Sequence, residues 1–376
     1  MLLSEFILIF IFLLIIIIFY QRYIEKNSFF SEENNNKSIQ SYLLIDKEIS
    51  YNPKKKPILW IYIPYEYNSR HWESFGSRSS CNLNQPYLYL TAKTIIKNCD
   101  ESFMICFIDD RSFNKLLPEW NINMSLIGDP VLSYIRRLGI MKLIYKYGGL
   151  NIPLSFLCFK NLINLYEQGT KSNKILIGEN IDQNITSVNY DFYPNIEFIG
   201  AQFNNETIGE LINFMERIIS NDYTAQTEFL GEFNRWCNKR VDCGKINVID
   251  GKYLGVKNRD EEVVNIEILL GEEYIEYYKE MYGIWIPDKM ILKRKAYEWF
   301  ARMSEEQILK SNVILAKYIL IASAPDSKLG VIEPLTQKPD WISFWKVPLN
   351  APVWGLQPVG LGDFVPREKF PDQYLN

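Results

Sequence analysis

The chain has 376 residues, and the 47% that are hydrophobic suffice for one large globular domain or two smaller ones. Its formal net charge of -4, from 41 basic and 45 acidic residues, argues against a broad nucleic-acid-binding surface. The single histidine, His71, excludes a histidine-rich metal site, and six cysteines without a C-x-x-C pair do not form a disulfide framework in a chain of this length.

An apolar segment at the start of the chain predicts a membrane anchor. Residues 6–20 read FILIFIFLLIIIIFY and contain no charged side chain. A helix needs roughly 20 apolar residues to cross a bilayer, with a lower end near 17. No small-residue cleavage site follows, so we expect an uncleaved single-pass transmembrane helix over residues 1–22. Arg22 and Lys26 on its C-terminal side favour a cytoplasmic position for the globular part.

A polar linker follows the anchor, and the folded part is predicted to begin at residue 54. Residues 23–53 are rich in Asn, Ser and Glu and show no sustained hydrophobic period. Beyond them, apolar strand-like runs alternate with helix-like runs, which is typical of an α/β domain. The predicted strands are 57–64, 103–110, 150–159, 174–180 and 195–201, and the predicted helices are 85–99, 129–148, 206–219 and 225–237.

The second half of the chain has a different character. Residues 261–282 and 304–323 are predicted as long helices, the second opening with Ser304 and Gln307 at the spacing of a capping box. Residues 332–376 are rich in Pro and Trp, and we expect them to wrap over the core. The expected organisation is an anchor at 1–22, a linker at 23–53, an α/β domain at 54–250 and a helical, Trp/Pro-rich C-terminal extension at 251–376 that packs on that domain.

The order of these segments resembles that of the DxD-containing sugar-transferase family, which are glycosyltransferases of the GT-A fold. The resemblance covers about residues 56–219, and its parts are WIYIP at 60–64, IDD at 108–110, LIYKYGGL at 143–150, GEN at 178–180 and NIEFIGA at 195–201. It implies a GT-A-like, Rossmann-like mixed sheet with flanking helices and transfer of a sugar from a sugar nucleotide to a glycan or protein acceptor. The whole chain also resembles proteins of large DNA viruses, which are similarly rich in Ile, Asn and Lys.

The strand that carries the family's metal motif lacks its acids here. In the family, two aspartates spaced D-x-D follow the double glycine and hold a divalent cation on the diphosphate of the sugar nucleotide. Counted from Gly148 and Gly149, those positions fall on Pro153 and Ser155, and residues 130–166 contain no acidic side chain. A DxD-type metal site therefore cannot be built from this strand, and no metal cofactor is expected there.

Two further family features are missing, and three interpretations stay open. The D-x-x-R pair of the preceding helix falls on Arg137 and Ile140, and no histidine follows His71. The chain is then a metal-independent transferase, in which Arg or Lys stabilises the leaving diphosphate, or a catalytically inactive, membrane-anchored binding or scaffold protein. A third interpretation is an unrelated α/β binding protein.

The candidate catalytic residues are Asp109, Asp110 and Glu228. The two aspartates end a central strand, where α/β sheets bind ligands, and Glu228 is a candidate base toward an acceptor hydroxyl. The alternatives are helix or turn capping for the aspartates and a solvated helix face for Glu228 and for the arginines below. The candidate substrate-binding residues are Arg136, Arg137, Gly148, Gly149, Asn151, Ser155, Glu179 and Asn180. The expected partners are the membrane, a sugar nucleotide as donor substrate and a glycan acceptor.

Overall fold

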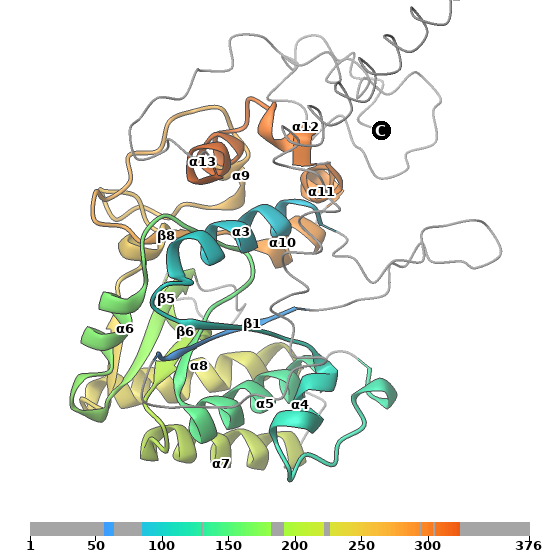
Figure 1. Ribbon diagram of the computed structural model, residues 1–376, viewed down its shortest axis with the longest axis vertical. Helices are drawn as coiled ribbons and strands as arrows, with labels where there is room; N and C mark the ends of the chain where they lie inside the picture. The colour runs from blue at the N-terminus through green and yellow to red at the C-terminus, as the bar shows by residue number, and fades with distance from the viewer. Residues whose placement is uncertain are drawn as a thin grey trace, which may run out of the picture.

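A mixed β-sheet with helices on both faces organises the chain (Figure 1). The computed structural model describes residues 56–63, 85–128, 131–181, 192–221, 226–293, 295–303 and 305–323. The strands are β1 (Ile58–Tyr62), β2 (Met104–Ile108), β3 (Gly149–Asn151), β4 (Phe156–Cys158), β5 (Ile175–Ile181), β6 (Phe192–Ala201), β7 (Ile246–Ile249) and β8 (Gly283–Trp285).

The α-helices of the described ranges fall into two groups along the chain. The first group is α3 (Tyr87–Cys99), α4 (Asp110–Leu116), α5 (Val131–Tyr147), α6 (Ile163–Gly169), α7 (Glu206–Asn221) and α8 (Gln226–Asp242). The second group is α9 (Ile266–Leu269), α10 (Asp288–Lys293), α11 (Lys295–Arg302), α12 (Glu305–Leu309) and α13 (Ile314–Ser323). Short 3₁₀ turns are η2 (Met124–Leu126), η3 (Lys171–Asn173) and η4 (Gly251–Leu254).

The main sheet has six strands in the order β2-β1-β3-β6-β5-β7. β1 is parallel to both β2 and β3, and β5 is parallel to β7, whereas β6 is antiparallel to β3 and β5. All strands of this sheet except β6 therefore end at the same edge, which we call the carboxyl edge. In this order β2 lies on one side of β1, and β3 lies on the other side of β1. Open α/β sheets bind ligands at such a reversal of strand order.

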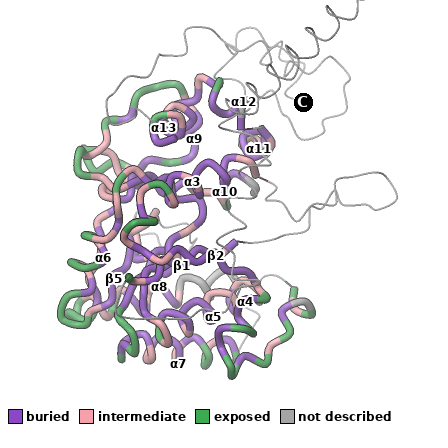
Figure 2. The backbone as a smooth tube through the Cα atoms, viewed as in Figure 1, coloured by how far each residue is buried: buried purple, intermediate pink, exposed green. Residues whose placement is uncertain are grey.

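The main sheet separates two hydrophobic clusters, because side chains alternate between the faces of a strand. On β1, Leu59 and Ile61 join the cluster that includes α3 and α10–α13, whereas Ile58 and Trp60 join the cluster that includes α4, α5, α7 and α8. Figure 2 shows buried backbone in the sheet and in the helices above and below it. The predicted mixed sheet with flanking helices is confirmed.

The predicted elements of the first half mostly match the structure. The strands expected at 57–64, 103–110, 174–180 and 195–201 are β1, β2, β5 and β6. The helices expected at 85–99, 206–219 and 225–237 are α3, α7 and α8, and the helix expected to end at the double glycine is α5.

The prediction of one strand over residues 150–159 is wrong. β3 ends at Asn151 and belongs to the main sheet, whereas β4 begins at Phe156 and pairs with β8 in a separate two-stranded sheet. Between them the chain turns at Pro153, whose carbonyl accepts a hydrogen bond from the Phe156 amide at 3.1 Å. Proline lacks an amide hydrogen and interrupts the ladder, so the apolar run is divided between two sheets.

The long helix predicted over residues 261–282 is also wrong, because this segment contains only the four-residue α9. Asn265 caps its start, and the chain leaves the helix at Gly271. Further on, Tyr274 is exposed, Ile275 is buried and Glu276 is exposed, which is the period of extended chain rather than of a helix. The helix predicted over 304–323 is two helices, α12 and α13.

Several predictions fall outside the described residues. These are the anchor at 1–22, the linker at 23–53, His71, the cap residues Asp129, Pro130 and Ser304, and the Trp/Pro-rich tail at 332–376. Of the helices in the described ranges, none combines the length and the apolar character that a bilayer span requires.

Candidate functional site

Asp109 caps a helix. It lies directly after β2, and its Oδ1 accepts hydrogen bonds from the Ser112 amide at 2.9 Å and from the Ser112 hydroxyl at 2.7 Å. The Ser112 hydroxyl in turn accepts the Asp109 amide at 3.0 Å, which completes a reciprocal capping box at the start of α4. The side chain is buried and occupied by these contacts, so capping accounts for Asp109.

Asp110 forms an ion pair with Arg136 at the carboxyl edge. Its Oδ1 accepts from the Tyr62 hydroxyl at 2.7 Å and from Arg136 Nε at 3.0 Å, and its Oδ2 accepts from Arg136 Nη2 at 2.8 Å. The guanidinium also lies over the Tyr62 ring, 5.5 Å from its centroid. Burial, reinforced by the negative charge of Asp110, raises the pKa of Tyr62. This charge-neutral cluster joins the ends of β1 and β2 to α5.

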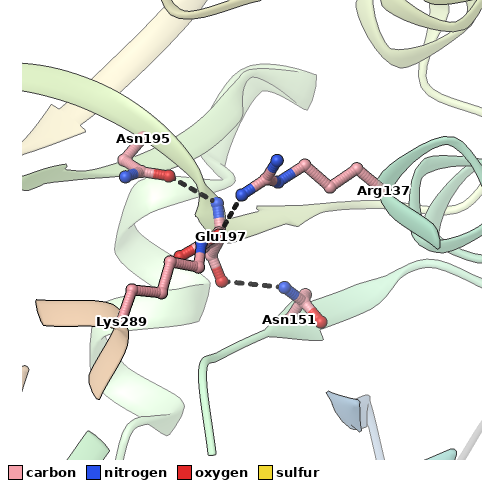
Figure 3. Close-up of polar contacts among 5 residues, drawn as sticks. All are labelled: Arg137, Asn151, Asn195, Glu197 and Lys289. Atoms are coloured by element: carbon pink, nitrogen blue, oxygen red, sulfur yellow. Dashed lines mark hydrogen bonds and ion pairs between the residues drawn. The ribbon is translucent and has the colours of Figure 1, made fainter. Parts of the chain in front are cut away.

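A second polar cluster is centred on Glu197, where β6 extends beyond the end of β3 (Figure 3). Glu197 Oε1 accepts hydrogen bonds from Arg137 Nη2 and from Lys289 Nζ. Asn151 Nδ2 donates to the Glu197 carbonyl at 2.8 Å, and Asn195 Oδ1 accepts from the Glu197 amide at 3.0 Å. Burial works to raise the pKa of Glu197, but Lys289 and Arg137 outweigh it and lower the pKa to about 2. We call Arg137, Asn151, Glu197 and Lys289 the edge cluster.

Neither arginine of α5 lies on a solvated helix face. The side chains of Arg136 and Arg137 are only 12% and 14% exposed, and each is paired with a carboxylate. Arg137 Nη1 is buried and has no hydrogen-bond partner among the described residues. Arg136 and Arg137, which are adjacent on α5, therefore belong to two different clusters at the carboxyl edge, one with Asp110 and one with Glu197.

The β4–β8 pairing brings a later segment beside the position of the missing acids. The Ile286 amide donates to the Ser155 carbonyl at 3.3 Å, so the residues that follow β8 run alongside the turn at Pro153. Asp288 and Lys289 begin α10 at this point. Burial raises the pKa of the Asp288 carboxyl, although Lys289 and the Ser155 hydroxyl act in the opposite direction.

Gly148 and Gly149 have a backbone role away from the carboxyl edge. Gly148 precedes β3 with a φ angle of 70°, and Gly149 begins β3 with a φ angle of 109°. Both angles are positive and favour glycine. A Cβ at Gly149 would come within 2.3 Å of the Ile58 carbonyl oxygen, and Trp60 Nε1 donates to the Gly148 carbonyl at 2.9 Å. The double glycine therefore ends α5 and lets β3 pair closely with β1.

The remaining candidates lie elsewhere. Glu179, near the end of β5, accepts the Gly251 amide at 2.8 Å and pairs with Lys257 at 2.6 Å, and Asn180 Oδ1 accepts the next amide along the strand at 2.7 Å. Glu228 belongs to α8, and its side chain lies outside the described part of the structure. The structure thus brings Arg137 and Asn151 together on Glu197 and places Ser155 beside the segment that supplies Asp288 and Lys289, whereas Glu179 and Asn180 lie elsewhere.

Glu197, Asp288 and Lys289 are not among the site residues predicted from the sequence. Glu197 interrupts the apolar run NIEFIGA, and a charged residue inside a buried strand is a signal that it has partners. Asp288 and Lys289 follow the apolar segment GIWIP, but only the β4–β8 pairing shows where they lie. Within the described ranges, no group of three or more His, Cys, Asp or Glu side chains is arranged to hold a metal ion.

Comparison with known proteins gives few relatives. No family model matches the chain, and no curated protein matches it. Among solved structures, the chain is similar to one named PaToxG Glycosyltransferase, with 13% sequence identity, a TM-score of 0.29, and coverage of 59% of this chain and 81% of that chain. A likeness of this size carries no argument about function. The six-stranded mixed sheet with flanking helices is itself compatible with a Rossmann-like glycosyltransferase fold.

Proposed function

We propose that the chain binds a sugar nucleotide at the carboxyl edge, beside the β1–β3 boundary, and transfers its sugar to a glycan or protein acceptor. In this proposal Arg137 and Lys289 take the role that a DxD-bound metal ion has in the family that the sequence resembles. The observation that carries the proposal is that two cations meet beside the Pro153–Ser155 turn, where the acids are missing.

Arg137 has unused capacity to bind an anion. A guanidinium carries five N–H donors in a planar fork that matches phosphate oxygens. Glu197 occupies Nη2, but Nη1 is buried with no partner in the described ranges. A buried donor without a partner costs about 1–3 kcal/mol, and a phosphate oxygen would remove that cost.

The charge of the edge cluster also favours a diphosphate. Arg137 and Lys289 carry two positive charges against one negative charge on Glu197, and burial raises the pKa of the nearby Asp288 carboxyl and so disfavours its negative charge. The Lys289 side chain is 46% exposed, so its ammonium group, which has three N–H donors, can bond a ligand on the solvent side while it stays paired with Glu197. A leaving diphosphate gains negative charge as the glycosidic bond breaks, and fixed cations stabilise that charge most in the transition state.

A second candidate function is binding of the sugar nucleotide without transfer. Asp109 and Asp110, the predicted catalytic acids, are both engaged in structural contacts, one in a capping box and one in an ion pair. That observation favours a binding protein unless another described carboxylate acts on the acceptor.

The test is calorimetric titration of the full chain with UDP- and GDP-sugars, first with Mn²⁺ and then with EDTA. We expect binding to persist in EDTA. The variant Arg137→Gln should bind the same ligand about 10- to 100-fold more weakly, because a hydrogen bond to a charged group contributes about 1.5–3 kcal/mol. The matched control is Arg217→Gln on the exposed face of α7, which should leave the affinity unchanged.

Two results would contradict the proposal. Binding that requires Mn²⁺ would mean that a metal ion, rather than Arg137 and Lys289, neutralises the negative charge of the diphosphate. Absence of binding to every sugar nucleotide, with and without Mn²⁺, would exclude a donor site altogether.

A further inference from the structure

Asp288 is a carboxylate near the carboxyl edge that has no ion pair among the described residues, and unlike Asp109, which also has none, it does not form a capping box. Glu197 bonds two cations, Asp110 bonds Arg136, and Glu179 bonds Lys257. Within the described part of the chain, no Lys or Arg side chain forms an ion pair with Asp288. Lys289, its neighbour in sequence, is directed to Glu197 instead.

The pairing of β4 with β8 fixes the location of this carboxylate. Phe156 is paired with Trp285, and the Ser155 carbonyl accepts the Ile286 amide at 3.3 Å. Asp288 is therefore the third residue after β8, and it lies beside Ser155 and the edge cluster. It is a carboxylate supplied from α10 at the position where β3 and the following turn supply none.

We propose that Asp288 is the base that accepts the proton of the acceptor hydroxyl, an inference that rests on the proposed function. The acceptor oxygen forms its bond to the anomeric carbon of the donor, and its proton goes to the Asp288 carboxylate. The bond from that carbon to the diphosphate breaks, and the leaving nucleoside diphosphate keeps the electron pair beside Arg137 and Lys289.

A second observation indicates a ligand near Asp288. The Tyr87 side chain at the start of α3 is 0% exposed, and its hydroxyl has no hydrogen-bond partner among the described residues. Burial raises the pKa of Tyr87, and the nearby charge of Asp288 raises it further. A phenol that stays protonated and unsatisfied beside a carboxylate is a donor available to a sugar hydroxyl.

The charged and titratable groups around Asp288 and Glu197 move the pKa values of these two carboxyl groups in opposite directions. Burial raises the pKa of Asp288 and the charge of Glu197 adds to this effect, while Lys289 and the Ser155 hydroxyl oppose it. Glu197, in contrast, is held ionised by two cations. Two nearby carboxylates whose environments move their pKa values apart are the usual pattern of a base and a charge stabiliser. A raised pKa also makes Asp288 the better proton acceptor.

The experiment uses the full chain, the sugar nucleotide that binds it in calorimetry, and water as the acceptor. Release of nucleoside diphosphate is followed for the wild type and for Asp288→Asn. We expect Asp288→Asn to bind the donor within about twofold of the wild type and to release product about 10²- to 10⁴-fold more slowly, the usual contribution of a general base. Asp260→Asn, at an exposed carboxylate, is the matched control and should match the wild type.

The pH profile of the wild type is a measurement that needs no variant. The rate should rise with pH as Asp288 ionises, with its midpoint above the ordinary pKa of an aspartate, and Asp288→Asn should lack this limb. Asn has nearly the same shape and carries no charge to bury, so its thermal unfolding at pH 7 should not be lower than that of the wild type.

The outcomes separate this inference from the proposed function. If the wild type binds no sugar nucleotide, both are overturned. If it binds a donor but releases no nucleoside diphosphate, or if Asp288→Asn releases it at the wild-type rate, the role of Asp288 is overturned and the donor site stands.

Discussion

Glu197 holds two cations on one carboxylate, and this arrangement determines how the stability of the protein depends on pH. Burial disfavours its charge, yet Lys289 and Arg137 lower its pKa from 4.5 to about 2. Its contribution to the free energy of unfolding is therefore present above about pH 4.5 and is lost as the pH falls toward 2. We expect Glu197→Gln to lower the free energy of unfolding at pH 7 by about 2 kcal/mol, measured by chemical denaturation.

A second glutamate on a helix surface provides the control for this prediction. Glu232 pairs with Arg235 three residues along α8, and its side chain is 44% exposed. Glu232→Gln should change the free energy of unfolding by less than about 0.5 kcal/mol, because solvent screens an exposed pair. The loss caused by Glu197→Gln should shrink when measured at pH 3. An equal loss at pH 3 and pH 7 would mean that the ion pairs of Glu197 contribute nothing.

At the residue scale, the sequence identifies one side of the candidate site. Arg137 is selected as a cation that could stabilise the leaving diphosphate, and Asn151 because it lies in the strand after the double glycine, where acids are expected. Glu197 and Lys289 are not selected, because the contacts that join them to Arg137 bridge α5, β6 and α10. Such long-range pairs depend on the pairing of strands, which local periodicity does not reveal.

Among the helices, α4 allows a direct test of the predicted catalytic role of Asp109. The capping box satisfies backbone amides at its start, and Asp109→Ala removes it. We expect a loss of about 1 kcal/mol in the free energy of unfolding, with the affinity for the sugar nucleotide unchanged. Asp109→Asn is the matched control, because Asn caps as well as Asp and should restore most of the stability. If folded Asp109→Ala bound the sugar nucleotide more weakly than the wild type, Asp109 would be part of the binding site after all.

At the same scale, the elements predicted best are those with a single clear pattern. β1, β2, β5 and β6 are apolar runs bounded by prolines or polar residues, and each is observed within a few residues of its expected range. The run from residue 150 to 159 is equally apolar but is divided between two sheets, and Pro153 is its one local signal. That division positions Ser155 for pairing with Ile286, and so it decides which later residues reach the candidate site.

At the scale of the whole molecule, the first strand and the last helices share one core. Leu59 and Ile61 of β1 belong to the same hydrophobic cluster as α3 and α10–α13. Ile58 and Trp60, on the other face of β1, pack with α4, α5, α7 and α8. Both helical layers therefore pack on β1. Loss of either layer would expose the apolar face of β1 that it covers, and exposing apolar area costs roughly 25 cal/mol per Å².

This shared strand predicts that both layers unfold in one cooperative transition, although the sequence suggested a boundary near residue 250. Hydrogen exchange at increasing denaturant tests it, with amides of α5 reporting on one layer and amides of α13 on the other. We expect the most protected amides of both helices to exchange with the same opening free energy, because neither layer keeps its core without β1. If α13 opened at a clearly lower free energy while α5 stayed protected, the C-terminal helices would be a separate unit. Asp288 and Lys289 would then reach Glu197 only while that unit is docked on the sheet.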